Sequence, residues 1–337
     1  MRAIVYDRPG APDVLRLTDR PVPEPGDGEV RVRLALAGVN PTDWKSRSKA
    51  QPGPEGQVPG QDGAGTVEAV GAGVDPARVG ERVWVWEAAY GRPHGTAAEC
   101  TVVPAAQAVR LPDDVPVELG AALGIPFLTA HRCLTVAETG PDRLAPGALA
   151  GRAVLVQGGA GAVGNAAIQL ARWAGATVIT TVSSPEKAAL ATAAGAHSVV
   201  DYRRQDVVAE VRRIAPDGVD AVVEVAAAAN SAATAQVLAP FGAVAIYADD
   251  GGPEVTVPVR PQMVLNARWQ FVLVYTVPPR AKELAVEAVA AAVADGAVRV
   301  GEEAGLPLHV FPLDRAADAH QAVQDGVVGK VLVDVTA

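Results

Sequence analysis

The stretch Val154-Leu-Val-Gln-Gly-Gly-Ala-Gly-Ala-Val-Gly-Asn165 decides the fold of this chain. An apolar run typical of a strand, residues 153–157, ends in three glycines spaced as Gly-x-Gly-x-x-Gly, and a helical pattern follows. Glycine has no Cβ, so Gly159 permits a tight turn, Gly161 lets a pyrophosphate approach the backbone, and Gly164 lets helix and strand pack closely. This order of elements predicts a dinucleotide-binding turn.

The expected helix starts at Ala162 and Val163. Its first N–H groups have no acceptor within the helix, and the helix dipole favours an anion there, so both residues are expected to bind phosphate. Glycine spacings of this kind also occur by chance in a chain with 34 glycines, where they form structural loops. A second apolar strand, residues 177–182, follows after one crossover helix, and this context favours the dinucleotide site.

The residues after the second strand indicate which dinucleotide is bound. An NAD-selective site usually has Asp or Glu about 20 residues after the glycines. This chain has Thr181-Val-Ser-Ser-Pro-Glu-Lys187 instead. Ser183 and Ser184 can donate to a phosphate, Lys187 adds a positive charge, and Tyr202 is expected on the other side of an adenosine 2′-phosphate. The pattern predicts NADPH, although Ser184 as a helix cap with a solvated Lys187 explains the same residues and is compatible with it.

Composition limits the possible functions. A chain of 337 residues with 49% hydrophobic and 20% charged residues is expected to form two globular domains. A net charge of −9 and scattered basic residues argue against a nucleic-acid partner. The N-terminus lacks a signal-peptide pattern and no apolar stretch reaches membrane-spanning length, so we expect a cytoplasmic protein without a membrane partner. Two distant cysteines support neither a disulfide framework nor a zinc ribbon.

The pattern along the chain predicts an α/β fold. Short apolar runs divided by Pro and Gly predict a β-rich, barrel-like segment in residues 1–127. Residues 128–275 alternate between strand and helix patterns, which predicts a doubly wound parallel sheet of the Rossmann type. Residues 276–337 are expected to return and complete the first domain. The strands expected in the sheet are residues 153–157, 177–182, 198–201, 220–225, 242–247 and 270–275.

Six segments in this order resemble the medium-chain dehydrogenase/reductase superfamily, and within it the zinc-free quinone oxidoreductase branch that includes ζ-crystallin-like enzymes. The resemblance covers essentially the whole chain and implies a GroES-like barrel beside the Rossmann domain. The segments are Gly38-Val-Asn-Pro-Thr-Asp43, Pro59-Gly-Gln-Asp-Gly-Ala-Gly-Thr-Val67, Gly80-Glu-Arg-Val83, Gly158-Gly-Ala-Gly-Ala-Val-Gly164, Thr181-Val-Ser-Ser-Pro-Glu-Lys187 and Val328-Gly-Lys-Val-Leu332.

The same resemblance bears on metal binding. Zinc-bearing members have Cys where Asn40 stands, Gly-His-Glu where residues 60–62 are Gly-Gln-Asp, and a loop of four cysteines that is missing here. Zinc prefers thiolate, imidazole and carboxylate ligands. We therefore expect no metal.

The resemblance also implies roles for single residues. Asn40 would contact the nicotinamide ribose or the substrate, and Lys45 or Thr129 would lie near the substrate carbonyl. Ser183, Lys187 and Tyr202 match the 2′-phosphate pocket of the family. The backbone around Tyr247, Ala248 and Leu273 would meet the nicotinamide. Lys330 stands where relatives hold a small polar residue near the cofactor, so its side chain is a departure from the family pattern.

Without a metal, the substrate has to accept hydride readily, which favours NADPH-dependent quinone reduction in a cleft between the domains. Reduction of enoyl or alkenal substrates, which are α,β-unsaturated carbonyl compounds, is an alternative that the sequence does not separate from it. A non-catalytic NADPH-binding sensor is the alternative from another functional class. An apolar strand at residues 271–275, placed at a sheet edge, predicts a homodimer.

Overall fold

The structure is a computed structural model that describes all 337 residues. The chain divides into two compact units, residues 1–125 with 308–337 and residues 126–307. Residues 276–337 were expected to complete the first domain, whereas helix α8 (Pro279–Ala294) belongs to the second unit. There α8 packs on helix α3 (Ala162–Trp173) and buries a stripe of small apolar side chains that includes Ala285, Ala288 and Ala292. The return to the first unit therefore comes at residue 308.

The second unit is built on a six-stranded parallel sheet with the order β10-β9-β8-β11-β12-β13. In chain order these strands are third, second, first, fourth, fifth and sixth, which is the doubly wound Rossmann arrangement. The predicted fold class is confirmed, and the strand order reverses between β8 and β11, where such folds bind ligands. The strands are β8 (Ala153–Gln157), β9 (Thr177–Val182), β10 (Ser198–Asp201), β11 (Val219–Glu224), β12 (Leu238–Ile246) and β13 (Arg268–Phe271).

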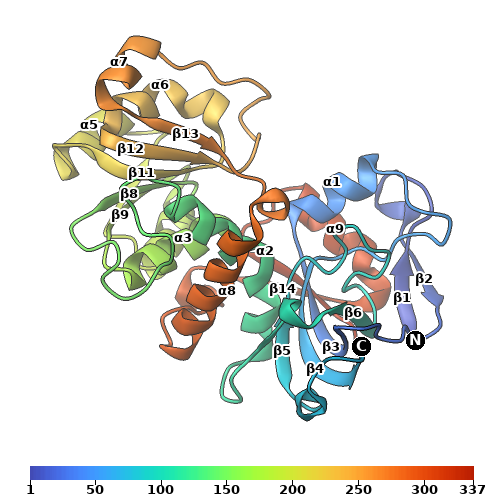
Figure 1. Cartoon of the computed structure of the whole chain (residues 1–337). Helices are drawn as coiled ribbons and strands as arrows, with labels where there is room; N and C mark the ends of the chain where they lie inside the picture. Colours follow the sequence, from blue (N-terminus) through green and yellow to red (C-terminus); the bar gives the residue numbers. More distant parts are fainter. The chain divides into compact units, whose positions relative to one another are not determined.

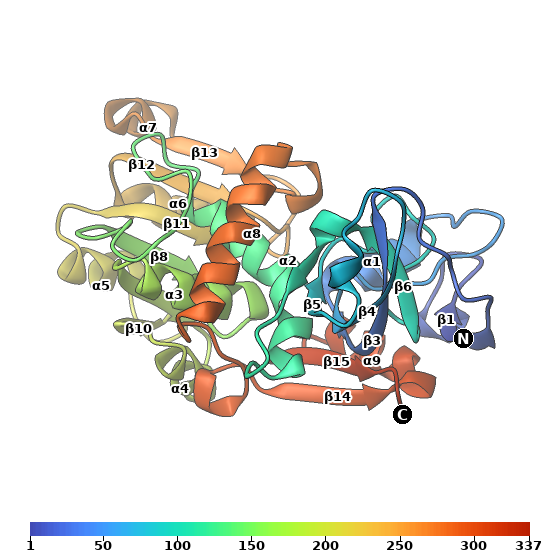
Figure 2. The same ribbon diagram turned by 60° about the horizontal axis from the view of Figure 1, so that its bottom comes forward.

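Helices cover both faces of this sheet (Figures 1 and 2). Helices α3 and α8 contact one another, and so do α5 and α6. The core beneath α5 and α6 contains Leu155, Val222 and Val244 from three neighbouring strands. The remaining helices of the unit are α4 (Pro185–Ala193), α5 (Val207–Ile214), α6 (Ala227–Val237) and α7 (Val259–Leu265).

The first unit contains a seven-stranded sheet with the path β14-β15-β3-β4-β5-β7, and β6 also pairs with β3. Figure 2 shows the C-terminal strands β14 and β15 beside strands from the N-terminal part of the chain. A separate hairpin joins β1 to β2. The strands are β1 (Arg2–Val5), β2 (Arg16–Asp19), β3 (Glu29–Val39), β4 (Asp62–Val70), β5 (Arg82–Val85), β6 (Cys100–Pro104), β7 (Ala108–Arg110), β14 (Leu308–Pro312) and β15 (Lys330–Asp334).

The residues of strand β3 alternate between the core and the opposite face of the sheet. Val30, Val32 and Leu34 are buried, whereas the alternating Arg31 and Arg33 point away from the core and pair with Glu68. Side chains on a strand alternate between its two faces, so a period of two places one set in the core. Helices α1 (Pro41–Lys49) and α9 (Ala316–Gln324) pack on one another in this unit.

Helix α2 (Val117–Leu134) carries the chain from the first unit into the second. It is broken at Gly124, where φ is −28° and ψ is −105°, and Pro126 follows inside the helix. None of the helices is both long enough and apolar enough to cross a membrane.

Both cysteines are free and buried. Burial raises the pKa of the Cys100 and Cys133 thiols.

Candidate functional site

The glycine turn follows β8 directly, and its three glycines are required for different reasons. A Cβ at Gly164 would lie 2.3 Å from the carbonyl oxygen of Gly158, and one at Gly159 would lie 2.1 Å from Thr180 Oγ1. A Cβ at Gly161 would meet nothing closer than 3.5 Å. Packing inside the protein therefore explains Gly159 and Gly164, whereas the space beside Gly161 is open to a ligand that approaches the backbone.

Helix α3 begins at this turn. Gly161 is its N-cap, and the following residues Ala162 and Val163 are half-buried, so the first turn of the helix is partly exposed. The turn is held by two contacts with β9, because the Gly159 N–H donates to the Thr181 carbonyl at 3.2 Å and the Gly158 N–H to Thr181 Oγ1 at 3.3 Å. This start of a twelve-residue helix presents N–H groups that suit a phosphate.

The other residues expected to bind the cofactor follow strands of the same sheet. Because all six strands are parallel, their carboxyl ends meet at one edge, next to the glycine turn. Ser183, Ser184 and Lys187 follow β9, Tyr202 follows β10, Tyr247 and Ala248 follow β12, and Leu273 follows β13. The topology therefore brings these residues of the second unit to one edge of the sheet.

The end of β9 has the predicted helix cap. Ser184 Oγ accepts the Lys187 N–H at 3.3 Å, and Pro185 occupies the first position of α4. The Lys187 side chain is half-buried, and Tyr202 beside it on the sheet edge is 52% exposed. The Tyr202 N–H donates to the Val182 carbonyl at 3.1 Å. The capping interpretation is confirmed, and the phosphate role stays a prediction.

Glu224, at the end of β11, is a residue of this edge that the sequence analysis missed. It is fully buried, accepts hydrogen bonds from the Ala226 N–H, Asn230 Nδ2 and Thr234 Oγ1 at 2.8, 2.9 and 3.2 Å, and its burial raises its pKa. These bonds fix the turn from β11 into α6. The sequence signal that could have identified Glu224 is an acidic residue at the end of an apolar strand.

The Tyr247 N–H donates to the Glu224 carbonyl at 3.1 Å, which holds the end of β12 against that of β11. Burial raises the pKa of the Tyr247 phenol, so it is protonated at neutral pH. Ala248 is half-buried, and Leu273 is exposed.

The first unit places Asn40 in a buried cluster of charged and polar side chains. Asn40 Nδ2 donates to Asp62 Oδ2 at 2.6 Å, and Asn40 Oδ1 accepts from Lys330 Nζ at 2.7 Å. Lys330 Nζ also lies 3.4 Å from Asp62 Oδ2. The three residues come from the end of β3, the start of β4 and the start of β15, and none is more than 3% exposed. Lys330, expected near the cofactor, thus directs its ammonium group into the first unit.

Asp62 also fixes the break in α2. Its Oδ1 accepts the Ile125 N–H at 2.8 Å, and a Cβ at Gly124 would lie 2.1 Å from the same oxygen. A carboxylate at the start of a helical segment is favoured by the helix dipole.

Asp43, in the first turn of α1, is a second buried carboxyl group of this cluster. Its Oδ2 accepts the Asn40 N–H at 2.7 Å, which caps the start of α1. Burial and the nearby Asp62 raise its pKa to about 7, against the lowering effect of the Asn40 and Gly60 N–H groups and of Lys330. Asp43 therefore holds a proton part of the time at neutral pH.

The other two residues expected to act in catalysis belong to different units. Lys45 is half-buried on α1, with its ammonium 5.9 Å from the centre of the Trp44 ring, a cation–π contact. Thr129 is buried in α2 and belongs to the second unit. Asn40 and Lys45 therefore share a unit, and Thr129 does not.

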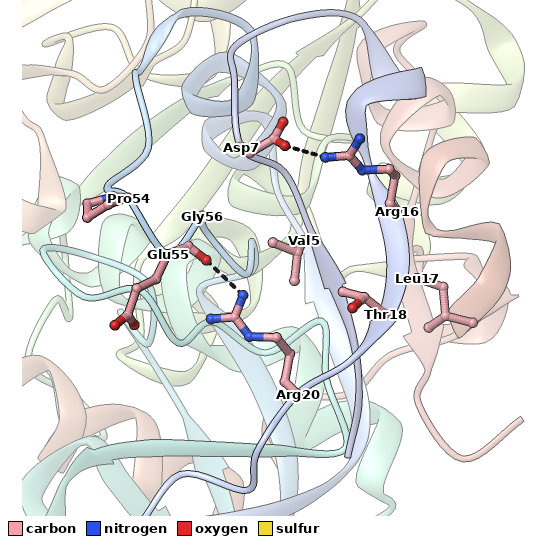
Figure 3. Close-up of a pocket in the computed structure, with 9 residues that line it drawn as sticks. All are labelled: Val5, Asp7, Arg16, Leu17, Thr18, Arg20, Pro54, Glu55 and Gly56. Atoms are coloured by element: carbon pink, nitrogen blue, oxygen red, sulfur yellow. Dashed lines mark hydrogen bonds and ion pairs between the residues drawn. The ribbon is translucent and has the colours of Figure 1, made fainter.

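A pocket of about 370 Å³ lies in the first unit between the β1–β2 hairpin and residues 54–56 (Figure 3). Arg16 pairs with Asp7 at its rim, and Arg20 Nη1 donates to the Glu55 carbonyl at 2.7 Å. No residue of the predicted site lines it. No group of three or more His, Cys, Asp or Glu side chains in the structure is arranged to hold a metal ion.

Comparisons with known proteins cover both units. Residues 26–113 match the family model described as "Alcohol dehydrogenase GroES-like domain", and residues 162–291 match "Zinc-binding dehydrogenase". The quinone oxidoreductase of Rattus norvegicus is 31% identical over 99% of this chain and 97% of the rat protein.

Two solved structures are similar over the whole chain. A mycobacterial protein solved in complex with NADPH is 32% identical, with a TM-score of 0.81 and 99% of both chains covered. A protein described as an NAD-dependent alcohol dehydrogenase is 31% identical, with a TM-score of 0.85, and covers 99% of this chain and 100% of its own. This chain therefore belongs to the medium-chain dehydrogenase/reductase superfamily of oxidoreductases, in its quinone oxidoreductase branch.

Proposed function

We propose that this oxidoreductase reduces quinones with NADPH and needs no metal ion. The observation that carries the proposal is the sheet edge of the second unit, where an open glycine turn lies beside Ser183, Ser184 and Lys187 and no acidic residue occupies the usual ribose position. The similarity to the rat quinone oxidoreductase supports the substrate class, and the similarity to the mycobacterial NADPH complex supports the cofactor.

The residues present fit this cofactor. The space beside Gly161 and the start of α3 suit the pyrophosphate. We assign the 2′-phosphate to Ser183, Lys187 and Tyr202, which follow the neighbouring strands β9 and β10. NADPH, when bound, supplies the hydride. The protein has to orient the acceptor and donate hydrogen bonds to the oxygen that gains negative charge. We assign the second part to Asn40 Nδ2, which carries two N–H groups and uses one for Asp62.

The residues around Asn40 do not fit zinc. Both polar atoms of the Asn40 amide are already bonded, one to a carboxylate and one to an ammonium group. Zinc sites need thiolate, imidazole or carboxylate ligands, and a buried ammonium beside the ion would repel it. Full activity after chelator treatment, with no zinc found by elemental analysis, is the expected result; activity that returns only when zinc is added would refute metal independence.

The cofactor assignment is tested by Lys187→Ala. We expect the NADPH KM to rise at least about tenfold, since one charged hydrogen bond to a phosphate is worth about 1.5–3 kcal/mol, and the NADH KM to change less than about twofold. Lys49→Ala removes an exposed lysine of the first unit and serves as the matched control. Equal changes with both cofactors would reject the 2′-phosphate role.

The substrate class is tested with a panel of quinones and a panel of α,β-unsaturated carbonyl compounds at the same NADPH concentration. Higher kcat/KM for quinones is expected. Preference for the carbonyl compounds would favour an enoyl or alkenal reductase, and tight NADPH binding without turnover of either panel would favour a sensor.

We also propose a homodimer formed through β13. The strand was expected at residues 271–275, whereas β13 spans Arg268–Phe271 and a 3-10 helix follows at Val274–Thr276. β13 pairs only with β12 and so lies at the sheet edge, and Phe271 on it is 67% exposed. Met263 and Val264 of the neighbouring α7 are exposed as well, which makes an apolar surface beside an open edge. Light scattering at micromolar concentration should give twice the chain mass for the natural protein and less for Phe271→Asp; a monomeric natural protein would refute the dimer.

A further inference from the structure

The Asn40 side chain is held at both ends by opposite charges. The carboxylate of Asp62 accepts from Nδ2 at 2.6 Å, and the ammonium of Lys330 donates to Oδ1 at 2.7 Å. An Asn amide has two donors on one side and an acceptor on the other. Rotating it by half a turn would place its NH2 group against the ammonium and its oxygen against the carboxylate. Lys330 and Asp62 together therefore allow one orientation.

The pairing of β15 with β3 determines the path of the Lys330 side chain. Lys330 opens β15, whose next residues pair with the end of β3 so that Leu332 lies opposite Gly38. A Cβ at Gly38 would lie 3.0 Å from Lys330 Cε and 3.1 Å from Lys330 Nζ, as well as 2.2 Å from the Ala121 carbonyl oxygen. Gly38 therefore leaves the space through which the lysine reaches Asn40, two residues further along the chain.

Lys330 is buried, so its ammonium group does not act as a surface charge in contact with solvent. Lys330 is 1% exposed and Asp62 is 0% exposed. A buried ammonium is stable only when it is paired and hydrogen-bonded, and the two oxygens of Asn40 and Asp62 provide those partners. The charge thus acts on its immediate neighbours.

Resting on the proposed function, we propose that Lys330 is a positioning residue for the reduction. With Asp62, it holds the Asn40 amide so that the second Nδ2–H remains directed to the acceptor oxygen. The ammonium acts through Asn40 and does not bind the cofactor, which replaces the cofactor contact expected from the sequence.

The decisive experiment compares Lys330→Met, Asn40→Ala and the double variant. We expect Lys330→Met to lower kcat at least about tenfold, because the amide can then reorient, and to leave the NADPH Kd within about twofold, because the glycine turn of the second unit is unchanged. Since Lys330 acts only through Asn40, the double variant should lose no more kcat than Asn40→Ala alone. Lys49→Met, an exposed lysine of the same unit, is the matched control.

Loss of folding is kept apart from loss of positioning by a second variant. Lys330→Met combined with Asp62→Asn removes both charges, so no unpaired charge stays buried. This variant is expected to unfold at a temperature closer to that of the natural protein than Lys330→Met does, and still to have reduced kcat, because an Asn at position 62 accepts either orientation of the Asn40 amide.

Three results would overturn the inference: an unchanged kcat in Lys330→Met, a loss confined to the NADPH Kd, or losses that multiply in the double variant. Side-chain amide NMR signals of Asn40 give a readout without turnover, with two separate and slowly exchanging protons in the natural protein and faster exchange in Lys330→Met. A natural protein that reduces no acceptor but shows these signals would refute the proposed function, while the fixed orientation of the Asn40 amide by Lys330 and Asp62 would stand.

Discussion

The glycine turn of the second unit and the Asn40 cluster of the first unit are built in opposite ways. The turn offers backbone N–H groups at the start of α3, and the absence of a side chain at Gly161 leaves open space beside them. The cluster uses the buried side chain of Lys330, which lies 268 residues from Asp62 and 290 residues from Asn40 in the chain. The difference shows that a backbone site depends on the absence of side chains, whereas a side-chain site depends on the presence of every partner.

The comparison is tested most severely by Asp62→Ala. This change leaves the Lys330 ammonium buried without its countercharge and removes the acceptor for Asn40 Nδ2 and the Ile125 N–H. Breaking a buried ion pair costs about 3–5 kcal/mol, so the free energy of unfolding in urea should fall by about that amount. Asp27→Ala, at an exposed position of the same unit, is the control. A loss below about 1 kcal/mol would show that the cluster is not held by its charges.

A smaller effect is expected from adding a single methyl group to the turn. Gly164→Ala places a Cβ 2.3 Å from the Gly158 carbonyl oxygen, a backbone atom that cannot move away cheaply. Overpacking of this kind costs about 1–3 kcal/mol, and NADPH binding should weaken with it.

Gly161→Ala is the matched variant, since its Cβ meets nothing within 3.4 Å and its φ of −79° suits alanine. Unfolding should change by less than about 0.5 kcal/mol, with NADPH affinity measured by fluorescence titration still reduced. Unchanged affinity would show that no phosphate approaches this residue.

A pH dependence of stability is also expected in the first unit, and it is measured as a slope and not as the cost of one substitution. Asp43 has a pKa of about 7 in the folded chain against 3.8 for an unperturbed Asp, so the folded state binds the proton more tightly. This contribution to stability is complete below pH 3.8 and is lost as the pH rises towards 7, by at most about 1.4 kcal/mol per pH unit. Asp43→Asn keeps an oxygen for the Asn40 N–H and should remove this slope. Equal slopes in the two proteins between pH 4 and 7 would contradict the raised pKa.

The same contrast explains what could be predicted from the sequence. The turn after Gln157 and the parallel sheet were predicted correctly, because alternation of strands and helices and the glycine spacing are local patterns. The helix cap at Ser184 could be predicted for the same reason, because a capping residue and the helix it caps are neighbours in the sequence.

The contacts of Lys330 were not predictable in this way. Its partners are set by the pairing of β15 with β3, and no local sequence pattern predicts that pairing. In addition, charged residues usually lie on the protein surface. The assignment of α8 to the first domain was wrong, because the partner of its buried alanines is α3 of the second unit, and chain order does not show that contact.

The burial of Cys100 and Cys133 has a practical consequence. Maleimides and disulfide reagents attack thiolates, and both native thiols are shielded and held in the protonated form. One cysteine introduced on the surface of each unit would thus be the preferred attachment point for a fluorophore or spin label, and distances between such probes could be followed through turnover in the otherwise natural protein.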